Sequence, residues 1–366
     1  MWLGSVTEPG RGDDLDRGRR RRHTLVWLSG LSMVLIATVV VAVGIGPVAI
    51  GPGTVAQIVG HHVLGWPDVV TWQGTDDTIV WLVRLPRVVL GAVVGAALAV
   101  TGMALQAMVR NVLADPYILG VTSGASTGAA AVILFGVGAG LGALGISALS
   151  VSAFLGALGA MVAVFLIARS GGTVTSVRLL LAGIAVGYAL YAATSFLIFA
   201  SDSPEGARSV LYWLLGSLTL AGWSGSLAIA CVAVAVTLAV LTMRGRHLDA
   251  LAIGDETAHT LGVSPARFRV QLLVVVALCV GAVVAVSGGI GFVGLVVPHL
   301  ARKVIGGAHQ RAIPVAALIG AIFLVWADVV ARTALAPQEL PIGIVTSLIG
   351  APFLLILVRR FHAAAT

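Results

Sequence analysis

The chain alternates long apolar runs with short polar ones, and the apolar runs repeatedly reach the length of a membrane-spanning helix. About 20 helical residues are needed to cross the hydrocarbon layer of a bilayer. Ten runs approach or exceed that length, the eighth being short: Thr24–Gly46, Val88–Val109, Tyr117–Val137, Ile146–Ala168, Val177–Ala200, Gly222–Met243, Phe268–Ser287, Phe292–Ile305, Ala312–Ala331 and Pro341–Val358. Because unpaired backbone groups are costly in lipid, each run should be helical. The pattern predicts an all-α polytopic membrane protein with about ten transmembrane helices, not an outer-membrane barrel.

Composition supports a membrane protein. The mean hydropathy is +1.05 and only 10% of residues are charged, whereas about a quarter are charged in soluble domains. The arginines at 19–22 precede the first run as in a signal peptide. That run is too long for one and has no small-residue cleavage site, so we expect it to be retained. Residues 1–23 are predicted to be a disordered Arg-rich tail and residues 24–362 the transmembrane domain.

The basic residues predict the orientation. If the N-terminus is cytoplasmic and the number of spans is even, 18 of the 22 Lys and Arg residues fall on the cytoplasmic side. Only Arg84, Arg87, Arg208 and Arg332 fall outside. By the positive-inside rule both termini are cytoplasmic, in a bacterial cytoplasmic (inner) membrane. Membrane lipid is then a sufficient partner for the net charge of +7, and no nucleic acid is expected.

One polar segment, Ala252–Val263, lies between the sixth and seventh runs and therefore in the cytoplasm. Asp249 is placed to cap a short helix that ends at Gly254, and Asp255 to cap a second that ends at Gly262. Helices this short are unstable alone and need a surface to lie on. An ordinary loop with turn residues is the alternative at this point.

Polar residues and glycines mark a second region of interest. Glycines four apart at Gly91 and Gly95, and at 120, 124 and 128, predict close helix packing. The polar residues of the second and third runs suggest a solute path, although hydroxyls also bond back to their own helix. With the glycines after the seventh run, the candidate path residues are Gln106, Asn111, Ser123, Ser126, Thr127, Gly288 and Gly289.

Two breaks in the helical pattern suggest an internal repeat. The sequence AVTG at 99–102 and the sequence AVSG at 285–288 each precede a break, one rich in polar residues and the other in glycine. Broken helices in corresponding places of two halves indicate a transport site. The two echoes would lie on helices of opposite direction, which predicts an inverted pseudo-repeat.

Four stretches together resemble the FecCD-type permease family, the membrane subunits of type II ABC importers for iron–siderophore complexes, haem and cobalamin. They are RLPRVVLGAVVGAALAVTGMALQAMVRNVLADPYILGVTSGAS (84–126), GDETAHTLGV (254–263), GGIGFVGLVVPHLAR (288–302) and ADVVAR with ELPIGIVTSLIGAPFLLIL (327–357). The resemblance runs from the first span to Leu357. It does not include the tail before Thr24 or the outer loop from Gly60 to Asp77.

The resemblance implies a permease that pairs with a second, identical copy and works with two copies of a cytoplasmic ABC ATPase. It also implies an extracytoplasmic substrate-binding protein. The chain has no phosphate loop of the form G-x-x-x-x-G-K-[ST], so we expect it to bind no cofactor and the ATPase to hold ATP and Mg. Residues 249–263 would be the coupling helices that contact the ATPase. Asp255, Glu256 and Thr257 would contact the ATPase, and Leu261, Gly262 and Val263 would fix the hinge back to the membrane, with Ala258 in the same coupling segment.

The resemblance also gives a role to three outer arginines. Arg84, Arg87 and Arg332 match positions that receive acidic residues of the binding protein. Such charge pairs mainly set the association rate and the register. The alternative is that they are interfacial anchors whose side chains reach the lipid headgroups.

The expected function is import of an iron–siderophore complex, with haem or cobalamin as the alternative substrate. His61 and His62 in the outer loop also suggest haem or metal contact, although solvated loop histidines are commoner. A secondary transporter usually buries ionisable residues at mid-membrane, and an intramembrane enzyme needs a catalytic constellation. Neither pattern is seen, so no catalytic or metal-binding residue is predicted.

Overall fold

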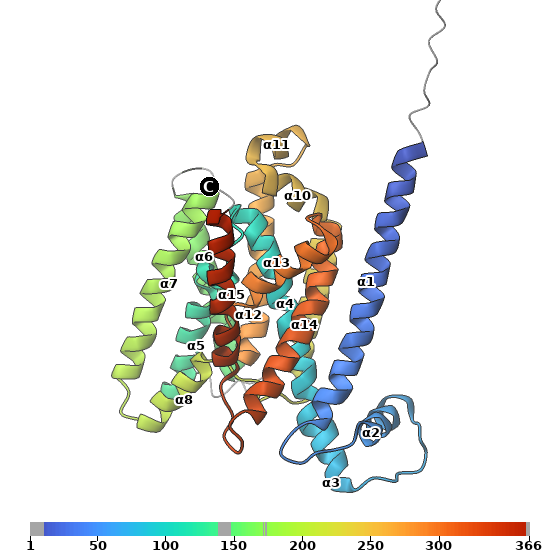
Figure 1. Cartoon of the computed structure of the whole chain (residues 1–366). Helices are drawn as coiled ribbons and strands as arrows, with labels where there is room; N and C mark the ends of the chain where they lie inside the picture. Colours follow the sequence, from blue (N-terminus) through green and yellow to red (C-terminus); the bar gives the residue numbers. More distant parts are fainter. Residues whose placement is uncertain (1–10, 138–147, 171, 173, 364–366) are drawn as a thin grey trace, which may run out of the picture.

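The computed structural model describes residues 11–137, 148–170, 172 and 174–363, and over these residues the chain is a bundle of helices without β-strands (Figure 1). Each predicted run contains a helix. These ten are α1 (Arg11–Gly44), α4 (Leu85–Val109), α5 (Val121–Phe135), α6 (Ala148–Arg169), α7 (Ser176–Phe199), α9 (Gly225–Met243), α12 (Pro265–Ser287), α13 (Val293–Ile305), α14 (His309–Thr333) and α15 (Ile342–Ala363). The predicted fold class is confirmed.

Seven of these helices are long and apolar enough to cross a membrane. The remaining three are shorter in their apolar part: α5, α13 and the stretch 342–357 of α15. The predicted third span is split, because Gly120 adopts a left-handed conformation (φ 72°) between a short 3₁₀ turn, η2 (Pro116–Leu119), and α5. A backbone of this kind is accessible to glycine at little cost.

The first helix, α1, begins at Arg11 and so includes residues 11–23 of the predicted Arg-rich tail. Adding residues to an existing helix costs little once the helix is nucleated, so the spanning segment can propagate into the charged stretch. Residues 1–10 of the predicted tail lie outside the described residues.

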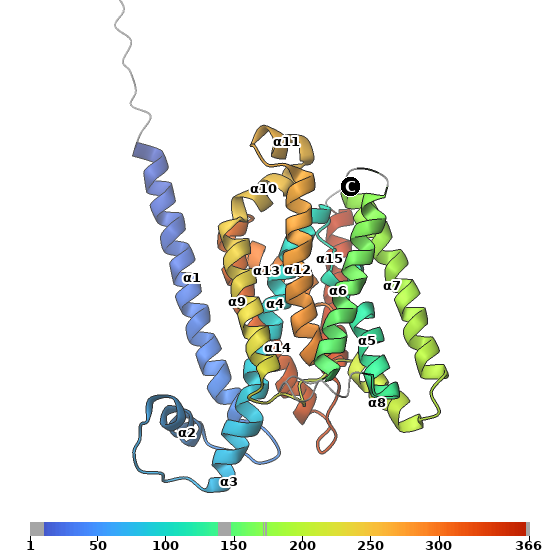
Figure 2. The same ribbon diagram turned by 180° about the vertical axis from the view of Figure 1, so that it is seen from behind.

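The short helices gather at the two ends of the bundle (Figures 1 and 2). At one end lie α2 (Pro52–Leu64), α3 (Gly74–Asp77), the π-helical turns of η1 (Thr78–Arg84) and α8 (Pro204–Leu214). At the other end lie α10 (Gly245–Ile253) and α11 (Asp255–Thr260), together with the beginning of α1 and the end of α15. We call the first the α2 end and the second the α11 end.

Helix α4 is the centre of the bundle and α1 is its edge. The apolar window that contains α4 is 78% buried, against 17% for that of α1. A Cβ atom on Gly95 of α4 would overlap the carbonyl of Gly320 in α14, and one on Gly124 of α5 would overlap that of Gly156 in α6. The glycine pattern therefore predicted the close helix contacts correctly, because only residues without a Cβ allow these backbones to touch.

The two echoing segments lie on neighbouring antiparallel helices. Helix α4 runs toward the α11 end and α12 runs away from it (Figure 2), and the two helices pack together. AVTG is within α4, and AVSG ends α12 at Gly288. Their opposite direction agrees with the predicted inverted pseudo-repeat.

Candidate coupling and docking surfaces

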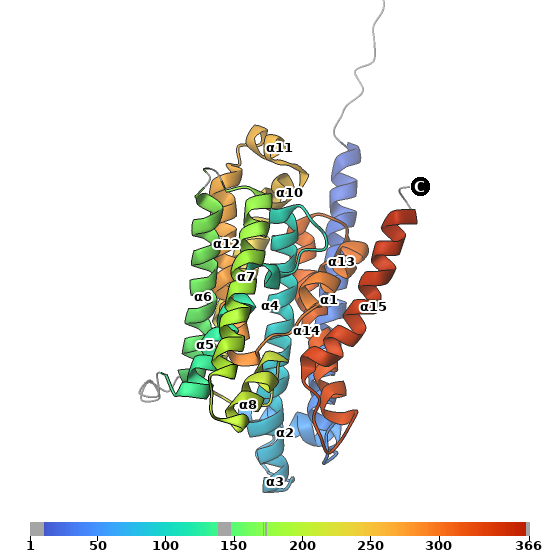
Figure 3. The ribbon, with the colours of Figure 1, turned by 90° about the vertical axis from the view of Figure 1, so that its left-hand side faces the viewer.

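Helices α10 and α11 form a projecting corner at the α11 end (Figure 3). Gly254 separates them, with a backbone conformation (φ 155°, ψ 164°) that is not helical. Ala258 packs inward, whereas Ile253 and Leu261 are 70% and 64% exposed. Glu256 and Gly262 are exposed beside them. The corner thus presents two apolar side chains and a carboxylate to the outside, which is the composition of a protein-binding surface rather than of a freely solvated loop.

A buried arginine fixes this corner to the bundle. Arg269 of α12 is 1% exposed and grips the carboxylate of Asp255 with two hydrogen bonds, of 2.6 Å and 3.0 Å. Its other donors reach Ser176 Oγ at the start of α7 (3.2 Å) and the carbonyl of Met108 near the end of α4 (3.4 Å). The hydrogen bonds from Arg269 hold the pKa of the Asp255 carboxyl below its ordinary value. One side chain therefore links α11 to three spanning helices.

A second anchor joins α10 to α14. Asp249 Oδ1 accepts hydrogen bonds from the backbone N–H (2.9 Å) and from the ring Nδ1 (2.6 Å) of His309. Burial alone would raise the pKa of the Asp249 carboxyl, but these hydrogen bonds and the neighbouring charges outweigh it, and the pKa lies below its ordinary value. The predicted capping roles are wrong. Asp249 lies inside α10 and Asp255 is the first residue of α11, because each carboxylate is bound by a residue from another helix.

The predicted coupling residues separate into two groups. Glu256, Leu261 and Gly262 are exposed and free to contact a partner. Asp255 and Thr257 are half-buried, and Ala258 and Val263 are buried against the bundle. Of the three residues expected to contact the ATPase, Glu256 is thus the exposed one, and the burial of Val263 is compatible with its expected place in the hinge. Arg269, Ser176 and His309 were missed, since they lie 14 to 93 residues from their partners in sequence.

At the opposite, α2 end, Arg84 is an internal residue. Its guanidinium donates to the carbonyls of Val43 (2.9 Å), Gly44 (3.1 Å) and Val48 (2.6 Å). The carbonyls at a helix C-terminus lack partners and carry partial negative charge. Arg84 therefore caps the end of α1, and Gly46 leaves the space for it, since a Cβ there would overlap the guanidinium.

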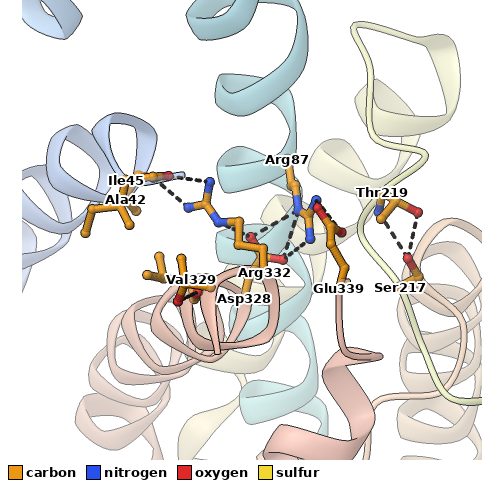
Figure 4. A network of polar contacts seen from close by, with 10 residues as sticks. Ala42, Ile45, Arg87, Ser217, Thr219, Asp328, Val329, Arg332 and Glu339 are labelled. Carbon is orange, nitrogen blue, oxygen red and sulfur yellow. Dashed lines mark hydrogen bonds and ion pairs between the residues drawn. The ribbon is translucent and has the colours of Figure 1, made fainter. Parts of the chain in front are cut away.

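Arg332 of α14 caps the same helix end. It donates to the carbonyls of Ala42 (2.6 Å) and Ile45 (3.0 Å), and its Nε lies 3.4 Å from the carboxylate of Asp328. Figure 4 shows its guanidinium directed at α1. Arg84 and Arg332 were expected to receive acidic residues of the binding protein, but both side chains are buried against this helix end.

Arg87 lies between two carboxylates (Figure 4). Its Nε and Nη2 contact Asp328 at 3.0 Å and 2.9 Å, and its Nη1 contacts Glu339 at 3.0 Å. Asp328 is 2% exposed, whereas Glu339 is 41% exposed. Of the three predicted docking residues, Arg87 is the one with a partner that faces the outside.

The candidate path residues have unequal surroundings. Gln106 is buried, donates to the carbonyls of Ala114 (3.4 Å) and Gly294 (3.3 Å), and accepts a hydrogen bond from Arg302. It therefore connects α4, the break after it and α13. Asn111 is exposed, and its Oδ1 accepts a hydrogen bond from the backbone N–H of Leu113.

The hydroxyls of Ser126 and Thr127 in α5 each reach a carbonyl of their own helix, and that of Thr127 also reaches the carbonyl of Leu190 in α7 (3.1 Å). Ser126 donates to the carbonyl of Thr122, and Thr127 to that of Ser123. The backbone-bonding alternative thus holds for both donors. Thr127 also contacts Thr194 Oγ1 at 2.9 Å, so it joins α5 to α7.

The glycines after α12 form a tightly packed break. Gly288 has φ 66°, and a Cβ on it would overlap the carbonyl of Trp213 at the end of α8. Gly289 and Gly291, with residues of α8 and α15, line a groove of about 570 Å³. Its exposed rim includes Leu215 and Leu348. The break therefore brings irregular backbone to a groove between α8 and α15.

The outer histidines belong to an aromatic cluster. The ring of His62 stacks on Trp81, with centroids 4.2 Å apart, and its Nε2 lies 3.1 Å from Asp77. His61 Nδ1 lies 2.9 Å from the carbonyl of Pro67. Both rings therefore join the last turn of α2 to the segment that follows it and to η1.

The bundle of apolar helices, the broken helices beside a groove and the anchored polar corner define a multi-pass membrane transport protein. Residues 34–360 match the model of the FecCD transport family. The chain belongs to this family, and the resemblance seen in its motifs is confirmed.

Individual relatives of the chain agree with this family assignment. The chain is 40% identical to the cobalamin import system permease protein BtuC of Halobacterium salinarum, over 92% of this chain and 96% of that protein. It is 44% identical to the hemin transport system permease protein HmuU of Yersinia pestis, over 78% and 85%. A solved metal-chelate type ABC transporter in an inward-facing conformation superposes with a TM-score of 0.77 at 32% identity, over 91% and 98%.

Proposed function

We propose that this chain is the permease subunit of an ATP-driven importer and that it carries an iron–siderophore complex across the cytoplasmic membrane. The α11 corner is the observation that carries the proposal. It exposes Ile253, Glu256 and Leu261, while Arg269 and Asp249 tie it to α4, α7, α12 and α14. A surface that is pushed from outside must be rigidly joined to the helices that move, and these contacts provide that connection.

The partner on this corner is a cytoplasmic ABC ATPase, two copies of which serve two permeases. ATP and Mg bind to the ATPase, and this chain binds no cofactor. Both chain termini and the α11 corner then face the cytoplasm, as the distribution of basic residues predicts. The α2 end faces the extracytoplasmic substrate-binding protein, with Arg87 as its docking residue.

A second, identical permease covers the groove between α8 and α15. The backbone of Gly289 and Gly291 lines this groove, and Leu348 at its rim is 70% exposed. Irregular backbone at membrane depth is tolerated where it is buried in protein or lines a water-filled cavity, but not against lipid. Two copies facing each other here would enclose the glycine breaks and form the translocation path between them.

Haem or cobalamin is the second candidate substrate, because the hemin and cobalamin permeases are similar along most of the chain. The solved transporter is described as metal-chelate type, a class of substrate to which an iron–siderophore complex belongs. Ion-coupled secondary transport is less well supported. The buried carboxylate of Asp328 is held by Arg87 and lies beside Arg332, so it is already neutralised.

The test is the ATPase activity of the purified permease–ATPase complex in lipid nanodiscs. We expect hydrolysis to accelerate when the ligand-loaded binding protein is added. Equal rates with and without that protein would contradict an import function. The ligand that the binding protein retains on purification then decides between an iron–siderophore complex, haem and cobalamin.

A further inference from the structure

The α2 end of the chain holds a charge cluster whose members differ in exposure. Arg87 and Arg332 face Asp328 and Glu339, so two positive charges meet two negative charges. Arg332 and Asp328 are buried and Arg87 is nearly so, at 12% exposed, whereas Glu339 is 41% exposed. Glu339 is therefore the member of this cluster that another molecule can reach and replace.

The donors of Arg87 leave little room for an additional carboxylate. Its Nε and Nη2 edge is taken by Asp328, and both oxygens of Glu339 lie within 3.1 Å of Nη1. A guanidinium binds carboxylates through a fixed fork of donors. An acidic residue of the binding protein that approaches Arg87 from outside must therefore displace Glu339, since Asp328 is enclosed.

The residues next to Glu339 are bonded to other elements, so displacement of Glu339 would affect more than its own side chain. The next residue, Leu340, donates its N–H to the carbonyl of Ala331 in α14 (2.9 Å), and Ile342 donates to that of Gly216 after α8 (3.2 Å). A depression of about 590 Å³ adjoins Arg87 and Glu339 and extends to Ser217 and Thr219. The Glu339 segment thus connects the arginine, the open depression and the start of α15 beside the groove.

We propose that Glu339 is an internal competitor for the carboxylate of the binding protein: it occupies Arg87 in the undocked permease and is displaced on docking. The proposal rests on the docking role of Arg87 in the proposed function. It adds that the docking surface is self-occupied in the undocked permease. Occupation by an internal group lowers the apparent affinity for the external one by the fraction of free sites.

The experiment measures binding of the ligand-loaded binding protein to the nanodisc-reconstituted permease–ATPase complex by interferometry. Glu339→Gln and Glu339→Ala should bind about two- to fivefold more tightly, the range expected for loss of a partly exposed ion pair. Glu205→Gln is the matched control. It removes the same charge from an exposed position on α8 at the same end, while the partners of Arg87 stay in place.

Equal gains for Glu205→Gln and Glu339→Gln would mean that only the overall charge matters, and would overturn the proposal. So would an unchanged affinity for both Glu339 variants. Arg87→Lys, which keeps one charge for Asp328, separates this failure from that of the docking role. If Arg87→Lys leaves the affinity unchanged, the docking surface itself is wrong. If it weakens binding and abolishes the gain from Glu339→Gln, the competition is confirmed.

Discussion

Residues that look alike in sequence have different physical roles in the folded chain. Asp255 and Glu256 are adjacent acids, but Asp255 is bound by the buried Arg269 and Glu256 is exposed. A buried arginine that loses its carboxylate is left with an uncompensated charge, which is costly. Glu256 can be changed at little cost, since exposed substitutions away from caps and networks change stability by less than about 0.5 kcal/mol.

This difference gives a prediction at the scale of the residue. Glu256→Lys should reduce co-purification of the ATPase while the thermal midpoint of the permease is unchanged, because only the outer surface is altered. Asp255→Asn should lower both the recovery of the ATPase and the thermal midpoint of the permease, because it also weakens the anchor on Arg269. Glu205→Lys, the same charge inversion at the opposite end, is the control and should retain the ATPase. Normal ATPase recovery with Glu256→Lys would contradict the assigned contact surface.

Among the elements, α4 and α14 pack with their backbones in direct contact. Their backbones meet at Gly95 and Gly320, where an added Cβ overlaps a carbonyl. The same two helices carry Arg87, Asp328 and Arg332, so their separation also sets the geometry of the charge cluster. Close packing here is therefore a condition for the docking surface as well as for stability.

Gly95→Ala should destabilise the protein by about 1–3 kcal/mol, the usual range for an extra methyl group in a filled core. Gly159→Ala in α6 is the matched control, because a Cβ at Gly159 meets open space. Gly159→Ala should leave the stability unchanged or raise it, since alanine is a better helix former than glycine. Thermal unfolding of the two variants in the same detergent measures the difference. A similar midpoint for both would mean that α4 and α14 are not in contact at Gly95.

The exposed surfaces of the bundle differ from one side of the molecule to the other. Apolar side chains exposed on α1 and α9 suit contact with lipid, whereas the groove between α8 and α15 also exposes the glycine breaks. This difference predicts where a second copy binds. After replacement of Cys231 and Cys279, Leu348→Cys in α15 should form an intermolecular disulfide in membranes under mild oxidation.

Val232→Cys on α9, which is exposed to a similar extent, should not form this disulfide. Gel electrophoresis without reductant detects the dimer. Equal cross-linking of both variants would indicate random collision rather than a specific interface, and none with Leu348→Cys would place the partner elsewhere.

The sequence by itself determined the long apolar helices and the family. Apolar runs of membrane length can be satisfied only as helices, and glycines four apart reveal close packing, because both signals are local. The tertiary structure alone decided the roles of single polar residues. Arg84 and Arg332 matched docking positions but cap α1, and Asp255 resembled a helix cap but binds Arg269. Glu339 gave no signal of its own. Partners 14 to 290 residues apart meet only after folding, and a buried charge takes its role from whichever group neutralises it.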